Sequence, residues 1–234
     1  MLQLGSIIKL IRRSFARFTH LLTIYGYYNR GRHYEPVSIS GRLVEGSKRD
    51  WKERWSAIEK VIEKYKAETV MDIGCAEGFF LKKAAEEHDC FSIGIDMNEE
   101  RLKLGELTRL YDGAENYAII KACLNPSKIK KLPKVDIILC LSVVHHIIKS
   151  DGIDSAISFV EALVKKTNKA IVFEIGTSDE KSFIGRMPDM PNGQEFFVKK
   201  FLEDSGCKNV SILNESKSIK KDSTRLMFVA EPII

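Results

Sequence analysis

The sequence predicts an α/β fold in which a mostly parallel sheet of seven strands carries helices on both faces and ends in an antiparallel hairpin. From residue 68 onward, short β-branched runs alternate with helical runs, as they do in parallel βαβ units. The runs IILCLSVV and AIVFEI are apolar throughout, which is typical of central strands covered on both faces. The final runs KNVSILNES and STRLMFVAEP have only a short polar link between them, which indicates an antiparallel pair.

The periodicity of apolar residues assigns the elements in chain order. The segment DWKERWSAIEKVIEKY predicts a helix, with Asp50 as its N-cap and with Trp51, Trp55 and Ile58 at helical spacing. The elements that follow are TVMDIG (strand), EGFFLKKAAEEH (helix), FSIGID (strand), NEERLKLGELTRLY (helix), NYAIIKACL (strand), VDIILCLS (strand), GIDSAISFVEALVKKT (helix), KAIVFEIG (strand), QEFFVKKFLEDSG (helix) and the two final strands.

Composition excludes several classes of protein. A chain of 234 residues fits one domain with an extension, and 44% hydrophobic with 29% charged residues is usual for a soluble globular protein. No apolar run approaches the roughly 20 residues that span a bilayer. The five cysteines are scattered, without CxxC or a Cys/His cluster, so neither a disulfide framework nor a zinc site is expected. We therefore expect reduced cysteines, no bound metal and a cytoplasmic protein.

The basic charge is concentrated at the N-terminus. Residues 1–33 hold six basic residues and no acidic one, so this arm carries a charge of +6. Because the net charge of the whole chain is +5, the remaining residues together carry −1. Residues 4–25 predict an amphipathic helix with an apolar stripe opposite a basic face. Two interpretations are open: the helix lies on an anionic lipid surface, or its stripe packs on the body of the protein.

The stretch VMDIGCAEGFF predicts a ligand site at a strand end. An apolar strand runs to Asp72, Gly74 and Gly78 follow, and a helix then begins. Glycines allow the backbone to turn sharply and approach a ligand, and the helix start offers free N–H groups. The spacing is GxxxG, in contrast to the GxGxxG of a dinucleotide site, so a dehydrogenase is disfavoured.

Three further strand ends contribute residues to the same edge of the sheet, where open α/β sheets bind ligands. Asp96 ends FSIGID and is placed to accept hydrogen bonds from two ribose hydroxyls, the alternative being the N-cap of the next helix. Cys123 and Leu124 follow the third strand, where an adenine would lie. The segment from Leu141 to His146 follows the fourth.

These residues together resemble the class I S-adenosylmethionine-dependent methyltransferases, whose sheet is Rossmann-like. Asp72, Gly74 and Gly78 match the first motif of that family, Asp96 matches its ribose acid, and VDIILCLSVVHHI matches its fourth motif. The resemblance covers about four-fifths of the chain and excludes the basic arm at 1–33. It implies a methyltransferase domain at 68–234, preceded by a linker and helix at 34–67 that cover the cofactor site. It also implies S-adenosyl-L-methionine as cofactor.

The resemblance assigns the cofactor contacts residue by residue. The methionine moiety would be surrounded by Asp72, Gly74, Cys75, Ala76 and Gly78, the ribose would be held by Asp96, and the adenine would lie beside Met97, Cys123 and Leu124, with Leu141 completing the site. Many members carry an acidic residue where Cys123 stands. Without it, Asn125 or a backbone carbonyl must accept from the adenine amino group.

A hydroxyl acceptor would need a base, and the candidates are His146 and His145, with His146 preferred. The alternative is that both histidines are structural. Glu174 either faces the acceptor or caps a helix, and Arg225 is either a buried ion-pair partner or an acceptor contact. Two roles are also open for the residues ahead of the first strand: they either line the open side of the cofactor site or pack in the core. These residues are Trp51, Arg54 and Trp55.

The acceptor is predicted from weaker signals. DIGCAEGFF, SVVHHI and STRLMFVAEP resemble prokaryotic methyltransferases that act on cell-surface glycans or lipid-linked intermediates, and more distantly the enzymes of the transfer RNA wobble uridine. A body at −1 offers few phosphate contacts, so we expect a hydroxylated glycan, lipid-linked or small-molecule acceptor rather than nucleic acid. Peripheral contact of residues 1–33 with the inner face of the membrane would fit such an acceptor. A tRNA methyltransferase and a non-catalytic cofactor-binding protein are the alternatives.

Overall fold

The computed structural model describes residues 4–29, 34–44, 51–180, 183–217 and 223–233. The elements run along the chain as α1 (Leu4–Asn29), β1 (Val37–Ile39), β2 (Arg42–Val44), α2 (Trp51–Tyr65), β3 (Thr69–Ile73), α3 (Phe79–His88), β4 (Phe91–Asp96), α4 (Glu99–Asp112), β5 (Tyr117–Lys121), α5 (Pro126–Ile129), β6 (Val135–Leu141), α6 (Val144–Asp151), α7 (Ile153–Val164), β7 (Thr167–Glu174), α8 (Gly193–Asp204), β8 (Cys207–Lys217) and β9 (Thr224–Pro232).

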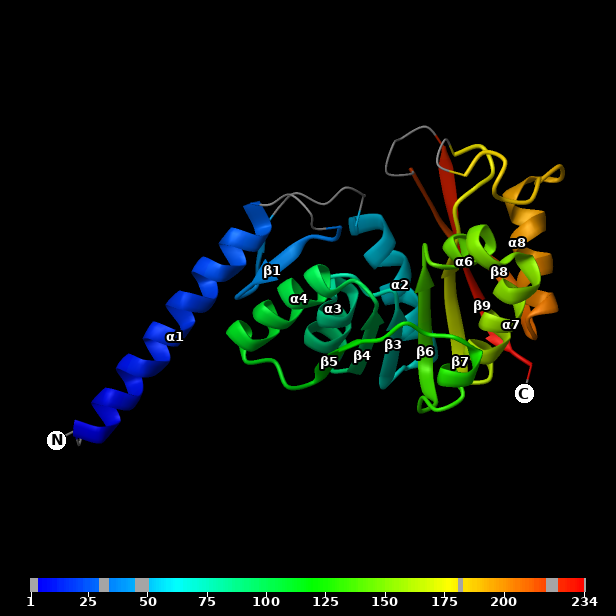
Figure 1. Ribbon diagram of the computed structural model, residues 1–234. Coiled ribbons are helices and arrows are strands. Elements are labelled where there is room, and N and C mark those ends of the chain that lie inside the picture. The colour runs from blue at the N-terminus through cyan, green and yellow to red at the C-terminus, as the bar shows by residue number, and fades with distance from the viewer. Residues whose placement is uncertain (1–3, 30–33, 45–50, 181–182, 218–222, 234) are drawn as a thin grey trace.

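A seven-stranded sheet forms the centre of the molecule, with the order β5-β4-β3-β6-β7-β9-β8 (Figure 1). The first five strands in this order are parallel, and β9 pairs antiparallel with both β7 and β8. The predicted parallel sheet with an antiparallel hairpin is therefore confirmed. Because strand order reverses between β3 and β6, their carboxyl ends flank the position where such sheets bind ligands.

Alternation along the strands gives the sheet two buried faces. Val70 and Val172 pack with Trp55 and Phe80 of α2 and α3, whereas Met71, Ile171 and their equivalents pack with α7 and α8. The two tryptophans belong to the first of these layers: Trp55 is 5% exposed and stacks on Phe80, and Trp51 meets Phe79 edge to face. Both tryptophans therefore pack in the core, as one of the two interpretations held.

Three local features differ from the prediction. Residues expected to form a linker contain a short hairpin, β1–β2, which pairs Val37 with Val44. The VVHHI segment forms helix α6, because β6 ends at Leu141 and Ser142 takes a left-handed conformation with φ of 63°. Helix α1 continues to Asn29, four residues beyond the predicted end at 25. The predicted N-cap, Asp50, lies outside the described residues.

Helix α1 extends away from the sheet and touches the body along α4 (Figure 1). Its Ile24 is 2% exposed and packs with Val37 and Leu104. The apolar stripe itself does not pack on the body, because Phe15 is 67% exposed and Leu22 is 55% exposed. Among the described residues, no helix combines the length and apolar character needed to cross a membrane.

Candidate functional site

The turn after β3 is built from left-handed residues. Gly74 has a φ of 79°, Ala76 of 49° and Gly78 of 77°. The Gly74 N–H donates to the carbonyl of Ile95 at 2.7 Å, and the Gly78 N–H donates to the carbonyl of Cys75 at 2.7 Å. A Cβ atom on Gly74 would overlap the Cγ2 methyl group of Val143, the residue that follows the neighbouring strand end. Glycine at this position is therefore required by both conformation and space.

Asp96 ties the turn to the end of β4. One carboxylate oxygen accepts from the Ala76 N–H at 2.9 Å, and the other accepts from the Asn98 N–H at 2.8 Å. Asn98, and not Asp96, is the N-cap of α4, because its side chain accepts from the Arg101 N–H at 3.2 Å. The capping alternative for Asp96 is therefore wrong. Each carboxylate oxygen keeps lone-pair capacity for a further donor, as a ribose diol requires.

Asp72 lies on the buried face of β3 toward α2 and is 3% exposed. Burial raises the pKa of Asp72 to about 8, and the negative charges of Glu35 and Asp96 raise it while Arg54 opposes them. A carboxyl group in this state is largely neutral at pH 7 without a ligand. A cation placed beside it would draw it toward the ionised form.

The remaining predicted cofactor residues occupy different environments. The Cys75 side chain packs in a core cluster with Leu81, and burial raises the pKa of its thiol well above the usual value. Only the backbone of Cys75 can therefore face the turn's ligand side. Met97 is 69% exposed beside Asp96, Leu124 is half-buried, and Leu141 is buried.

Asn125, the predicted adenine acceptor, and the nearby carbonyl of Cys123 are both already engaged after β5. The Asn125 side chain caps α5 by accepting from the Lys128 N–H at 3.0 Å. The exposed Cys123 offers a backbone carbonyl that accepts from the ammonium group of Lys128 at 2.7 Å. An adenine amino group would share these acceptors with Lys128 or donate elsewhere.

The two histidines of α6 differ in environment. His145 is 2% exposed, and its Nδ1 accepts from the Gly176 N–H at 3.1 Å, which places its own proton on Nε2. The His146 ring lies 4.3 Å from the His145 ring and is exposed at the edge of the site. Burial of part of the ring lowers the pKa of His146, and the positive charges of Lys149, Arg225 and Arg101 act in the same direction. His146 is therefore a neutral, accessible imidazole at pH 7.

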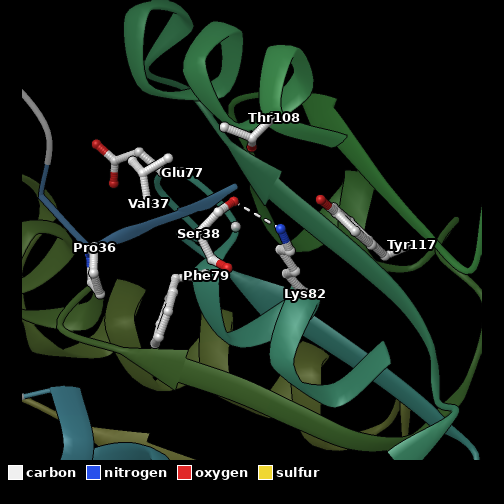
Figure 2. A pocket seen from close by; sticks show the side chains of 9 residues that line it. Pro36, Val37, Ser38, Glu77, Phe79, Lys82, Thr108 and Tyr117 are labelled. Carbon is white, nitrogen blue, oxygen red and sulfur yellow. Dashed lines mark hydrogen bonds between the residues drawn. The ribbon is translucent and has the colours of Figure 1, made fainter. Parts of the chain in front are cut away.

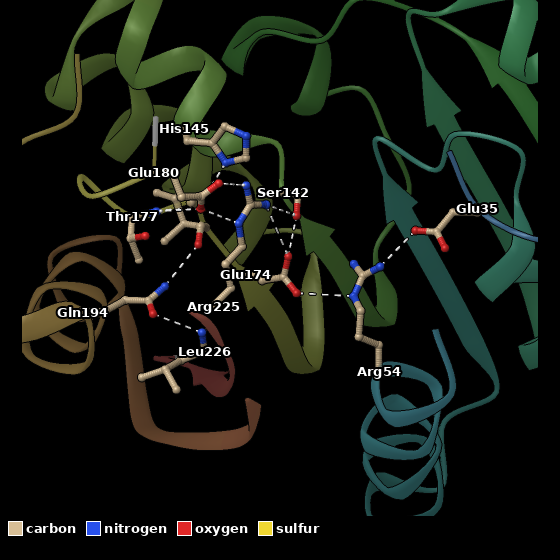
Figure 3. Close-up of polar contacts among 12 residues, drawn as sticks. Glu35, Arg54, Ser142, His145, Glu174, Thr177, Glu180, Gln194, Arg225 and Leu226 are labelled. Atoms are coloured by element: carbon tan, nitrogen blue, oxygen red, sulfur yellow. Dashed lines mark hydrogen bonds and ion pairs between the residues drawn. The ribbon is translucent and has the colours of Figure 1, made fainter. Parts of the chain in front are cut away.

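A buried ionic network crosses the carboxyl edge of the sheet (Figure 3). Arg54 of α2 donates to Glu35 at 2.9 Å and pairs with Glu174 at 3.3 Å. Arg225 of β9 donates through two nitrogens to Glu180, both at 2.6 Å, and lies 3.8 Å from Glu174. We call these five residues the ionic network. Arg225 is thus a buried ion-pair partner, which was one of its two predicted roles. Glu174 belongs to the same buried cluster, a role that was not predicted for it.

Ser142 links this network to the histidine segment. Its hydroxyl hydrogen-bonds Glu174 and accepts from Arg225 at 2.9 Å, while its N–H donates to the carbonyl of residue 174 at 2.8 Å. Although burial opposes it, Glu174 and Glu35 raise the pKa of Arg54 above its usual value, so the guanidinium stays charged. The network thereby fixes the start of α6 relative to β7 and β9.

Replacing Glu174 by alanine should destabilise the protein by about 3–5 kcal/mol, because two buried guanidinium groups each lose a carboxylate. Chemical denaturation monitored by circular dichroism measures the change. The matched control is Glu161→Ala, which removes a carboxylate from an exposed pair with Lys165 and should leave stability unchanged. Equal effects of the two substitutions would contradict a structural role for the network.

A segment ahead of α2 is clamped against the turn. Residues 34–44, called the strap, place the N–H groups of Tyr34 and Glu35 on the carboxylate of Glu77 at 2.7 and 3.0 Å. Lys82 donates to the Ser38 carbonyl at 2.7 Å (Figure 2). Its ammonium group also pairs with Asp112. The small pocket drawn in Figure 2 lies between the strap and α3, and Gly74, Asp96 and Leu141 do not line it.

The sequence did not indicate these strap contacts. Glu77 stands inside the glycine turn, and a single buried acid at such a position has no local signature in the sequence. Gly105 of α4 was also missed: a Cβ there would overlap the backbone carbonyl oxygen of Glu77. The sequence does carry a signal for Gly105, because it is an isolated glycine within a helical pattern. Such a glycine lowers helix stability by about 1 kcal/mol relative to alanine and often marks close packing.

The comparison with protein families decides the identity. A family model described as a methyltransferase domain matches residues 64–186. The chain belongs to this methyltransferase family. Its sheet order and the site at the β3–β6 switch point are those of a class I, S-adenosylmethionine-dependent member.

Solved methyltransferases share this fold. The bifunctional kinase-methyltransferase WbdD aligns with a TM-score of 0.67 and 21% identity, over 80% of this chain and 40% of that chain. The N-terminal domain of EvdMO1, determined in the presence of SAH and D-fucose, aligns with a TM-score of 0.63 and 16% identity, over 90% of this chain and 95% of that chain.

The relatives found by sequence comparison are named tRNA U34 carboxymethyltransferases. A tRNA U34 carboxymethyltransferase from Photobacterium profundum is 25% identical over 211 residues, which are 86% of this chain and 61% of the relative. Another from Pseudoalteromonas translucida is 29% identical over 112 residues, covering 47% of this chain and 34% of the relative. The methyltransferase thus spans about three-fifths of the length of the first relative.

The residues around the turn suit the family's cofactor, S-adenosylmethionine. Because Gly74 has no Cβ, the turn lies directly against Val143 at the neighbouring strand end. The pKa of Asp72 is raised by burial and by the nearby charges of Glu35 and Asp96, so a ligand that brings positive charge would favour its ionised form. S-adenosylmethionine carries both a sulfonium and an ammonium group, whereas a pyrophosphate cofactor would bring negative charge.

Proposed function

We propose that the protein transfers the methyl group of S-adenosylmethionine to a hydroxyl group of a glycan, lipid-linked or small-molecule acceptor by in-line displacement. The observation that carries this proposal is the neutral, accessible imidazole of His146 beside the β3–β6 switch point. When bound, S-adenosylmethionine supplies an electrophilic methyl carbon on a positively charged sulfur. The acceleration expected from holding acceptor and methyl group in line is up to ~7–11 kcal/mol.

The cofactor would be held by residues of the turn and the neighbouring strand ends. Asp72 faces the positive charges of the methionine end, and the backbone of the turn surrounds that end at Gly74, Cys75, Ala76 and Gly78. Asp96 accepts from the ribose hydroxyls, since both of its oxygens are already oriented by backbone N–H groups. Met97, Cys123, Leu124 and Leu141 flank the adenine and the remaining surface.

His146 would act as the base, and His145 would position it. The His146 imidazole would accept the proton of the acceptor hydroxyl, whose oxygen gains the methyl group as the carbon–sulfur bond breaks and the sulfur leaves as a neutral thioether. His145 has its Nδ1 occupied by the Gly176 N–H and packs against both His146 and Phe183, so it fixes the ring beside it. This assignment agrees with the preference for His146 made on sequence grounds.

Replacing His146 by alanine should lower kcat about 10²–10⁴-fold and leave the cofactor Kd within about twofold, because the ring serves only proton transfer. Calorimetry with S-adenosylmethionine and a labelled-methyl assay measure the two quantities. In the wild type, the rate should stay constant near pH 7 and fall only below the ordinary histidine pKa of about 6.5, since the pKa of His146 is lowered.

The matched variant is His145→Ala, which should lower thermal stability because the Gly176 N–H loses its buried acceptor. If His146→Ala keeps full turnover and the wild-type pH profile, the base assignment is wrong. If neither variant affects turnover while the cofactor still binds, both histidines are structural.

A transfer RNA acceptor is the second candidate, and the names of the sequence relatives favour it. One observation weighs against it. The chain outside residues 1–33 carries a net −1, which offers little attraction to phosphates.

One experiment separates the acceptor classes. The full-length protein is incubated with methyl-labelled S-adenosylmethionine and host extract divided into RNA, lipid-glycan and small-molecule fractions. Label in the lipid-glycan or small-molecule fraction supports the proposal, and label confined to RNA supports the alternative. Calorimetric cofactor binding without label in any fraction indicates a non-catalytic binding protein. A lipid-linked acceptor would further place the enzyme in the cytoplasm, at the inner face of the membrane.

A further inference from the structure

Four large apolar side chains of α1 face water on one side of the helix. The exposed fractions are 67% for Phe15, 57% for Phe18, 55% for Leu22 and 66% for Tyr25. Their spacing of three and four residues places them in one row, which we call the apolar stripe. Soluble surfaces usually carry such side chains singly, so a continuous row marks an interaction surface.

The other side of the helix is fixed on the body. Ile24 is buried against Val37 and Leu104, and Tyr28 packs on the same cluster. Arg17 lies over the ring of Tyr111 at 5.7 Å and reaches its carbonyl at 3.5 Å. These anchoring residues sit roughly 120° round the helix from the apolar stripe. The rotation of α1 is therefore set by the α4 contact, and the apolar stripe stays turned away from α4.

The charge of the arm identifies the partner. Residues 1–33 carry six basic residues and no acid, while the rest of the chain is at −1. A helix that combines aromatic and aliphatic side chains with lysine and arginine binds the interface of an anionic bilayer through burial and attraction together. A second copy of the chain is a poorer partner, because pairing two arms would bring two charges of +6 together.

We infer that α1 is an interfacial helix that docks the enzyme on an anionic membrane surface through the apolar stripe. It would lie in the plane of the interface, with the body held beneath it by α4. This inference rests on the proposed function, in which the enzyme can act on an acceptor that is carried by a membrane. Vesicle binding is measured without turnover, so its failure is distinguishable from a failure of the catalytic proposal.

The test is co-sedimentation of the full-length protein with vesicles of phosphatidylcholine alone and of phosphatidylcholine mixed with phosphatidylglycerol. The wild type should bind the anionic vesicles and bind the neutral ones far more weakly. The double variant Phe18→Ser, Leu22→Ser should lower the partition coefficient about tenfold or more, because both side chains lose their burial in the interface. Replacing Arg12 by glutamine should weaken anionic binding about fivefold.

The matched control is Ala16→Ser, Thr23→Ser, two exposed positions on the side of α1 away from the apolar stripe. It should bind as the wild type does. Both double variants should keep the wild-type thermal unfolding temperature and cofactor affinity. The inference fails if the wild type ignores anionic vesicles or if the two double variants bind equally. It also fails if light scattering shows a dimer that only Phe18→Ser, Leu22→Ser disrupts, since a second copy then covers the apolar stripe.

Discussion

Replacing Gly74 by alanine is expected to weaken S-adenosylmethionine binding at least tenfold and to lower the free energy of unfolding by about 2–4 kcal/mol. Two effects add. The residue has a φ of 79°, a left-handed conformation that costs about 1–2 kcal/mol for a residue with a Cβ. The new methyl group would also overlap Val143 and push the turn away from the neighbouring strand end. Calorimetry and denaturant titration measure the two changes.

Two variants separate these effects. Gly113→Ala introduces the same strain at a φ of 69° where a Cβ meets nothing within 4 Å, so it should cost stability without changing cofactor affinity. Val143→Ala removes the overlapping methyl group, so the double variant with Gly74→Ala should recover part of the lost affinity. An affinity loss that Val143→Ala does not relieve would mean that the close approach of the two strand ends is not the cause.

Replacing Asp72 by asparagine is expected to weaken cofactor binding about 10–100-fold, because the proposed partner of the positive methionine end is lost. The wild type should release a proton on binding near pH 7, since the pKa of Asp72 is about 8 without a ligand and a cationic ligand lowers it. Its affinity should therefore rise from pH 6 to pH 8, whereas that of the variant stays constant. Calorimetry in buffers of different protonation enthalpy counts the proton.

The same substitution should stabilise the unliganded protein in alkali. Because the pKa of Asp72 is raised on folding, the stability contributed by its protonated form is fully present below about pH 4 and is lost as the pH rises through about 8. Asparagine keeps a neutral side chain, so its stability relative to the wild type should improve by about 2 kcal/mol or more between pH 5 and pH 9. A constant difference in stability across this range would show that Asp72 is ionised in the free protein.

The fold could be predicted largely because its signals are local. The stretches IILCL and AIVFE of the two apolar runs lie in β6 and β7 at the sheet centre, although SVV of the first run lies beyond the end of β6. The final hairpin forms β8 and β9, as the missing crossover helix indicated. The strand ends that carry Asp72 and Asp96 are also where the periodicity placed them. Each of these features depends on a few neighbouring residues and on general rules of strand connection.

The ionic network could not be predicted in the same way. Its members come from the strap, α2, β7, the segment after β7, and β9, and nothing in the local sequence says that positions 54, 174 and 225 converge. Arg225 within an apolar strand was the one visible sign. The orientation of α1 was equally undetermined, because the sequence left open whether the apolar stripe packs on the body or faces a lipid surface. Its contact with α4, formed at Ile24, decides which side remains exposed.

The hydrogen bonds between Glu77 and the strap make two amide hydrogens local reporters of the position of the glycine turn. The N–H groups of Tyr34 and Glu35 are protected from solvent exchange only while the Glu77 carboxylate stays beneath them. Because Glu77 stands between the two glycines of the turn, any displacement of that turn must release or pull these amides. Their deuterium uptake should therefore slow when S-adenosylmethionine binds at the turn, and its rate would report how often the site opens.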